Sequence, residues 1–308
     1  MSTKLDSSLG ASLIGSYFAA ILYGLTVLQA YHYFSRYWGR DEVYIYCLVL
    51  FVTLLDTLNQ GMVMHSAWYT IVDNYCNVSA LLVPSWTANW AVWVSEFIAF
   101  TVQTFYAYRL YKLSGKKLWW LSAVIFVLSL TTLIIYTIET VLLFKHGTYV
   151  YFKKVKYMTI MTFAFNLGND VLITCSMTLL LMKHRLVAKM KQTENLIRRL
   201  ISFTIYSGAV TTLVTMISLI LATAHGSTSW DLILVLPLAK LYINSMLAFL
   251  NSRDSLREKH SDTAITVNFA TGHNAPSQAS RNETESTIPV PESFHLTTNV
   301  TTYAEQKP

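Results

Sequence analysis

Seven stretches of 20 to 26 residues contain almost no charged side chains, and they constrain the fold more than any other feature of this chain. They cover residues 9–34, 43–65, 88–110, 118–142, 157–182, 200–224 and 231–250. A helix of about 20 residues crosses a hydrocarbon core that is about 30 Å thick. Because lipid offers the backbone no hydrogen bonds, such segments fold as helices and not as single strands. The sequence therefore predicts an all-α, polytopic membrane protein with seven transmembrane helices.

The composition argues against soluble proteins and against most enzymes. Asp, Glu, Lys and Arg make up 13% of the chain, which is too little charge to cover a soluble surface. The net charge of +6 comes from short clusters between the apolar stretches, so we expect no nucleic-acid partner. Three cysteines and eight scattered histidines form no zinc or di-iron motif, and no nucleotide-binding or hydrolase motif occurs. We therefore expect neither an enzyme nor a bound metal or cofactor.

The distribution of Lys and Arg predicts the orientation, because cytoplasmic loops are enriched in these residues. With the N-terminus outside, fifteen of them fall on the inner side and five on the outer side. Four of the outer five lie close together between residues 142 and 157, which is the one contrary observation. Six of the inner residues lie in the basic loop 183–199, where we expect a cytoplasmic partner. The N-terminus is thus predicted outside and the C-terminus inside.

Two further features concern a connection and the C-terminus. Asn77 begins an Asn-Val-Ser tripeptide in a predicted outer connection, which makes it a candidate glycosylation site. Residues 261–308 hold 14 Ser or Thr and four of the six prolines. Because few large apolar residues remain there to offset the loss of chain entropy, this region is predicted to be disordered. We predict a transmembrane domain at 1–252 and a disordered Ser/Thr-rich cytoplasmic tail at 253–308.

Four charged residues lie near the middle of apolar stretches, from which lipid normally excludes charge. They are Asp56, Glu96, Asp170 and Lys240. Helical spacing places amide side chains on the same helix faces. These amides are Gln103, Asn166 and Asn244. We expect the polar faces to meet inside the bundle as one intramembrane polar cluster, with Lys240 paired with one or more of the acids.

Two interpretations of this cluster stay open. It is either a polar cavity that binds a ligand, an ion or a proton, or a buried network that fixes helix packing. A lysine in a seventh helix also occurs in retinal proteins, but Leu236 stands where microbial rhodopsins carry an aspartate one turn before it. G-protein-coupled receptors share the helix count and the orientation. Their signature motifs are absent, because Tyr108 and not an acid precedes Arg109, and Ser245 and not proline follows Asn244.

Several segments carry a resemblance to a known family. They are Leu9-Gly10 through Tyr23-Gly24, Gln29-Ala30-Tyr31-His32-Tyr33-Phe34, Asp41, Asp56, Lys240-Leu241-Tyr242-Ile243-Asn244-Ser245 and Leu250-Asn251-Ser252-Arg253. Through these segments, residues 9–257 resemble a family of basidiomycete fungal membrane proteins known only as a domain of unknown function. The resemblance implies seven membrane helices and a fungal origin, and it implies no activity.

The leading hypothesis for the function is a receptor-like sensor. A small-molecule ligand would enter from the outer side, and the polar cluster would couple helix movement to the basic loop 183–199. A transporter or proton-coupled carrier is the first alternative, because the same cluster would change its protonation during transport. A structural membrane protein without a ligand is the second alternative. In every case the lipid bilayer surrounds the protein, and we expect it in the plasma membrane.

Overall fold

The computed structural model describes residues 2–37, 39, 41–74, 77, 85–146, 149–187, 191–224 and 232–252, and these residues form helices and turns without a strand. The α-helices are α1 (Ser2–Tyr37), α2 (Val43–Trp68), α4 (Trp86–Leu113), α5 (Trp119–His146), α6 (Tyr149–Val187), α7 (Lys191–Ala224) and α8 (Leu232–Asn251). A short π-helix, η1 (Tyr69–Asp73), continues α2. The predicted tail, residues 253–308, lies outside the described residues.

Each predicted apolar stretch lies inside one of these helices, apart from one residue at the start of two stretches, so the all-α prediction is confirmed. All the described helices except α4 are long and apolar enough to cross a membrane, which makes six spans by length and composition. The chain is therefore a multi-pass membrane protein. Helix α4 is 28 residues long but carries Glu96 and Gln103 near its middle, which lower its hydropathy.

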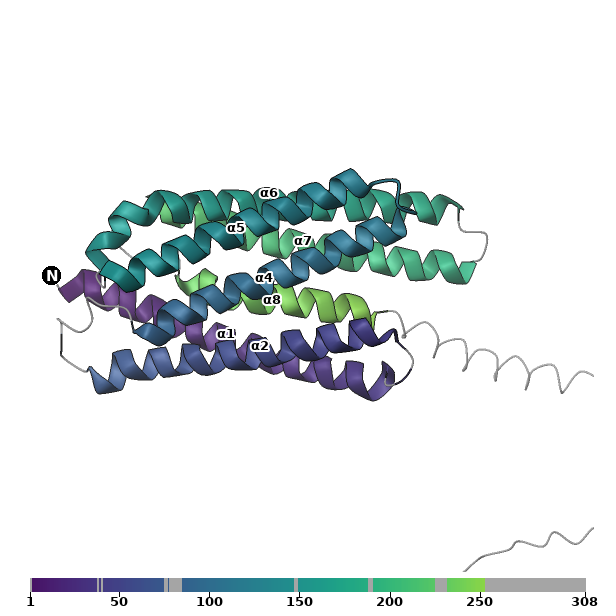
Figure 1. Cartoon of the computed structure of the whole chain (residues 1–308). Helices are drawn as coiled ribbons and strands as arrows, with labels where there is room; N and C mark the ends of the chain where they lie inside the picture. Colours follow the sequence, from purple (N-terminus) through teal and green to yellow (C-terminus); the bar gives the residue numbers. More distant parts are fainter. Residues whose placement is uncertain are drawn as a thin grey trace, which may run out of the picture. The chain divides into compact units, whose positions relative to one another are not determined.

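Helices α4 and α8 lie at the centre of the packing (Figure 1). Helix α4 packs against α2, α5, α6 and α8, and α8 packs in addition against α1 and α7. Because neighbouring helices surround α4, its side chains meet protein more often than lipid. This position explains how α4 tolerates a carboxylate and an amide that a lipid-facing helix would exclude.

Large apolar side chains point outward from the other helices. Ile21 in α1, Leu54 in α2 and Leu179 in α6 are each more than 60% exposed. A water-soluble surface rarely presents so many such groups, whereas a surface in contact with lipid gains from them. The distribution of apolar side chains thus agrees with helices that face a bilayer.

Helices α1 and α8 are held in a parallel register by two asparagines. Nδ2 of Asn244 donates to the carbonyl oxygen of Leu22, and Nδ2 of Asn251 donates to that of Gln29, each at 3.0 Å. Both the donors and the acceptors are seven residues apart, which is two helical turns. Gly15 permits a close approach nearer the start of both helices, since a β-carbon there would lie 2.6 Å from the carbonyl oxygen of Leu232.

Candidate intramembrane polar site

Lys240 and Asp56 form a fully buried ion pair between α8 and α2. The distance from Lys240 Nζ to Asp56 Oδ1 is 2.5 Å, and neither side chain is exposed. The ammonium group also donates to Oδ1 of Asn59 at 2.7 Å. Asn59 follows Asp56 by three residues, so both side chains project from the same face of α2. The charge of Lys240 is thus compensated entirely within the protein.

Asn59 extends this ion pair to α4. Its Nδ2 donates to the carbonyl oxygen of Ala91 at 2.6 Å and to Oγ of Ser95 at 3.0 Å. Helices α2, α4 and α8 are therefore joined by one set of polar contacts around a single lysine. Because the pair is fully buried and its geometry is close, its evident role is to fix how these three helices pack.

Glu96 belongs to a second polar group on the other side of α4. Nδ2 of Asn166, in α6, donates to both carboxylate oxygens of Glu96, at 3.2 and 3.3 Å. Oδ1 of Asn166 in turn accepts from Nε2 of Gln103, at 3.4 Å. The amide of Asn166 therefore links the carboxylate of Glu96 to Gln103, two helical turns further along α4.

Asp170 is held in the same group by α4 and α8. Its Oδ2 accepts a hydrogen bond of 2.7 Å from the phenol of Tyr242, and its Oδ1 accepts from Nε2 of Gln103 at 3.5 Å. Asn169 adds α5 to the group, because its Nδ2 donates to Oε1 of Gln103 and to Oγ of Ser129. Side chains from α4, α5, α6 and α8 thus form one hydrogen-bonded network, which we call the Glu96–Asp170 network.

No lysine or arginine among the described side chains forms an ion pair with Glu96 or Asp170. Both are buried, with exposed fractions of 8% and 4%, and their hydrogen bonds come from neutral amides, a phenol and the hydroxyl group of Thr132. Burying a carboxylate without a counter-charge is costly, and inside a membrane it commonly marks a functional group. The Glu96–Asp170 network therefore differs in kind from the Lys240 ion pair.

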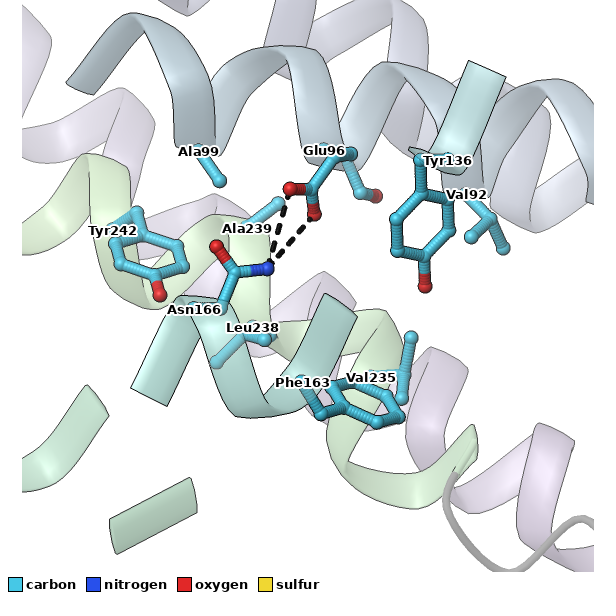
Figure 2. A pocket seen from close by; sticks show the side chains of 11 residues that line it. Val92, Glu96, Ala99, Tyr136, Phe163, Asn166, Val235, Leu238, Ala239 and Tyr242 are labelled. Carbon is cyan, nitrogen blue, oxygen red and sulfur yellow. Dashed lines mark hydrogen bonds between the residues drawn. The ribbon is translucent and has the colours of Figure 1, made fainter. Parts of the chain in front are cut away.

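A small cavity adjoins the network near the ends at which α4 and α8 begin. It has about 20 Å³ of free volume, and its lining includes Glu96, Asn166, Tyr136 and Tyr242. Figure 2 shows the carboxylate of Glu96 and the amide of Asn166 facing each other across its middle. A buried water needs roughly 10 to 15 Å³ measured in this way, so the cavity accommodates one or two waters and no organic ligand.

A second cavity, of about 30 Å³, lies further along the same helices. Its lining includes Gln103, Tyr106, Asp170 and Tyr242, together with hydroxyl side chains of α7. Tyr242 borders both cavities. The two spaces are therefore in series along the bundle, with the Glu96–Asp170 network between them.

The predicted single cluster is divided in the structure. Lys240 contacts Asp56 and neither of the other two acids, and Asn244 turns toward α1. The physical reason is the rotation of about 100° per residue around a helix. Positions 240 and 242 of α8 consequently face different neighbours, α2 and α6, whereas Asn244 lies one turn beyond Lys240 on nearly the same face and reaches α1.

Asn59 and Tyr242, which hydrogen bond to Lys240 and Asp170, were not among the predicted site residues. Asn59 lies three residues after Asp56, so helical spacing alone would have identified it as a second group on that face. Tyr242 carried no such signal, because a tyrosine in an apolar helix is more often a packing or interface residue. Its role depends on Asp170 of α6, to which its hydroxyl group donates a hydrogen bond.

Two other predicted sites lie near the ends of the helices. Asn77 is exposed, in the connection between η1 and α4. Most of the predicted basic loop 183–199 is helical, because α6 continues to Val187 and α7 begins at Lys191. Within this segment, Arg185 donates to Glu194 at 3.0 Å, and Arg198 lies 3.6 Å from the same carboxylate. The contact between Arg185 and Glu194 joins the end of α6 to the start of α7. Lys189 lies outside the described residues.

Comparison with known proteins gives one match. Residues 166–255 match a family described as a family of unknown function (DUF6534). This range runs from Asn166 in α6 through α8, and it includes Asp170, Lys240 and Tyr242. No curated protein and no solved structure matches the chain. The match supports the expected resemblance to a domain of unknown function and assigns no activity.

Proposed function

We propose that this protein is a receptor-like membrane sensor with seven spans, its N-terminus outside and its C-terminus inside. Helix α4 supplies the seventh span, because it lies among the six apolar helices and is as long as α5. The basic residues support the orientation, since the ends of α4 and α6 carry Lys112, Lys183 and Arg185. We place the protein in the plasma membrane and assign it no catalytic activity.

One observation carries the sensor proposal, namely the Glu96–Asp170 network between two cavities. A stimulus that changes the charge or the hydration of Glu96 alters its bonds to Asn166, which also contacts Gln103 on α4. Gln103 and Tyr242 both bond to Asp170, so the change reaches α6 and α8 together. Because the network connects several helices, a change in the charge or hydration of Glu96 can shift these helices relative to one another.

The output is the basic loop 183–199, which faces a cytoplasmic partner. Helix α6 runs from Asn166 and Asp170 to Arg185, so a shift of α6 moves the Arg185–Glu194 contact directly. Glu194 also interacts with Arg198, which lies on α7. A movement of α6 relative to α7 therefore changes the charge pattern that this loop presents.

The test uses a charge change at Glu96 in place of an unknown stimulus. Glu96→Gln keeps the shape of the side chain and removes its charge. In lipid nanodiscs, hydrogen–deuterium exchange of residues 183–199 should change about fivefold, which corresponds to a coupling of about 1 kcal/mol. Glu139→Gln is the matched control, because Glu139 is also buried but accepts a hydrogen bond from Thr159 outside the network.

The outcomes separate this proposal from the two alternatives. Exchange at 183–199 that is the same in Glu96→Gln, Glu139→Gln and the wild type would remove the support for a sensor and favour a structural protein. A transporter requires space for its solute, and cavities of about 20 and 30 Å³ hold no organic molecule in this conformation. Solute uptake into vesicles would therefore have to involve a rearranged bundle.

A further inference from the structure

The two cavities lie at successive depths along α4 and share one residue. Val92 lines the first cavity and Tyr106 lines the second. These residues are about 20 Å apart along a helix that rises about 1.5 Å per residue. Tyr242 lines both cavities, and its hydroxyl group points toward the interior of the bundle (Figure 2). Together the cavities and the network thus extend through much of the thickness of a hydrocarbon core.

The bond from Tyr242 to Asp170 lies where the two cavities adjoin, because Tyr242 lines both of them. The phenol oxygen lies 2.7 Å from Oδ2 of Asp170, and Asp170 itself lines the second cavity. Gln103 holds the other carboxylate oxygen. Asp170 therefore faces water-sized space on one side and a tyrosine hydroxyl on the other, and the same tyrosine borders the first cavity.

The titratable groups that face this point come from several helices. Helix α4 contributes Glu96 toward the first cavity and Tyr106 toward the second, and α5 contributes Tyr136 to the first. Helix α7 contributes only Thr, Ser and Gly to the described lining of the second cavity. The nearest cation toward the inner end that we identify is Arg109, whose guanidinium lies 3.8 Å from the centre of the Phe249 ring. Lys240 is occupied by Asp56.

From this geometry we propose that Tyr242 and Asp170 form the proton-transfer step of a path across the bundle, so that the protein passes protons between the two sides of the membrane. The proposal uses the same network as the proposed sensor function and the same seven spans. It goes beyond sensing, because it assigns the network a cargo. A proton carried by water fits cavities of this size, whereas an organic solute does not.

The step conserves protons at each atom. A hydronium-like water in the first cavity gives a proton to the phenol oxygen of Tyr242, and the phenol passes its own proton to Oδ2 of Asp170. One O–H bond forms and one breaks at the phenol, so Tyr242 ends as the neutral phenol that it was. Asp170 then releases its proton to a water in the second cavity and becomes a carboxylate again. Glu96 borders the first cavity and attracts the incoming proton. The gradient across the membrane sets the direction.

The test measures proton flux into vesicles that contain the purified full chain. A pH-sensitive dye inside the vesicles reports acidification while a potassium diffusion potential with valinomycin drives protons inward. We expect the wild type to acidify the lumen faster than protein-free vesicles. Tyr242→Phe removes only the hydroxyl group and should reduce the protein-dependent rate about a hundredfold, the size of effect typical of a positioned proton-transfer group. Asp170→Asn should reduce it at least as much.

Tyr37→Phe is the matched control. Tyr37 is also buried and donates a hydrogen bond to the carbonyl oxygen of Leu250, but it lines neither cavity, so this variant should conduct like the wild type. A second measurement tests the proposal even if one of the variants folds poorly. Infrared difference spectra of the wild type between acidic and alkaline pH should contain a protonated carboxyl band that Asp170→Asn loses and Tyr37→Phe retains.

Three results overturn the proposal. They are a wild-type flux equal to that of protein-free vesicles, a wild-type flux retained in a folded Tyr242→Phe variant, and a carboxyl band unaffected by Asp170→Asn. The exchange experiment on Glu96→Gln is independent of these results. If protons cross the membrane but exchange at residues 183–199 does not change in Glu96→Gln, the proton-transfer proposal stands and the sensor proposal fails. If exchange changes but no protons cross, the sensor proposal stands and the proton-transfer proposal fails.

Discussion

Lys240 and Asp56 lie 2.5 Å apart, Nζ to Oδ1, with both side chains fully buried between α8 and α2. Asn59 accepts a second hydrogen bond from the ammonium group and donates to the backbone of α4. Lys240, which lies at the middle of a described helix, therefore joins three helices, and Glu96 and Asp170 are left with neutral partners. The buried acids therefore have different roles: Asp56 neutralises Lys240 in helix packing, whereas Glu96 and Asp170 are the acids to which we assign chemistry.

Removing only one member of the ion pair should strongly destabilise the bundle. Lys240→Met leaves Asp56 buried without its counter-charge, and the expected loss is roughly 3 to 5 kcal/mol of unfolding free energy. Denaturant titration in detergent micelles, monitored by circular dichroism, measures this loss. The double variant Asp56→Leu with Lys240→Met removes both charges and should recover most of the stability. A double variant as unstable as the single one would show that the pair contributes more than mutual neutralisation.

Gly15 should be far less tolerant of alanine than Gly24, although both lie in α1. A β-carbon at Gly15 would meet the carbonyl oxygen of Leu232 at 2.6 Å, whereas a β-carbon at Gly24 has no atom within 4 Å. Gly15→Ala must therefore push α1 away from α8, and we expect a loss of about 1 to 3 kcal/mol. Gly24→Ala should cause no loss, because alanine favours the helix. Thermal unfolding of the two variants side by side tests this, and equal midpoints would contradict the close approach.

The places of the seven described α-helices followed from the sequence because lipid imposes a simple length requirement on apolar segments. The limits of the helices followed less well. Helix α6 begins at Tyr149, eight residues before the apolar stretch that predicted it, since a helix continues past its apolar part wherever the backbone remains hydrogen bonded. Helix α4 was predicted from a stretch that contains Glu96, and its central position explains why that charge is tolerated.

The buried charged residues could be identified from the sequence, but their partners could not. Charge in an apolar stretch is a local signal, and it identified Lys240, Glu96 and Asp170. Which acid meets Lys240 depends on the rotation of α8 and on the helix beside it, and neither is encoded in residue spacing along one segment. The role of Tyr242 is visible only once α6 places Asp170 against its hydroxyl group.

Asn77 should carry an N-linked glycan when the chain is made in a eukaryotic host. Its side chain is exposed in the connection between η1 and α4, which the proposed orientation places outside. Endoglycosidase treatment should therefore increase the gel mobility of the wild type, and Asn77→Gln should run at the treated position without treatment. Asn282→Gln is the control, because its acceptor tripeptide lies in the predicted cytoplasmic tail and should never be modified.

The same experiment fixes which side of the membrane the first cavity faces. The connection that carries Asn77 leads directly into Ser85, the N-cap of α4, and the first cavity is lined from Val92 onward on that helix. A glycan at Asn77 thus places Glu96 in the outer half of the membrane and the basic loop 183–199 at the inner face. A mobility shift that persists in Asn77→Gln, and is lost only when Asn282 and Asn299 of the tail are both replaced, would reverse the orientation. The route from Glu96 to Asp170 would then begin on the cytoplasmic side.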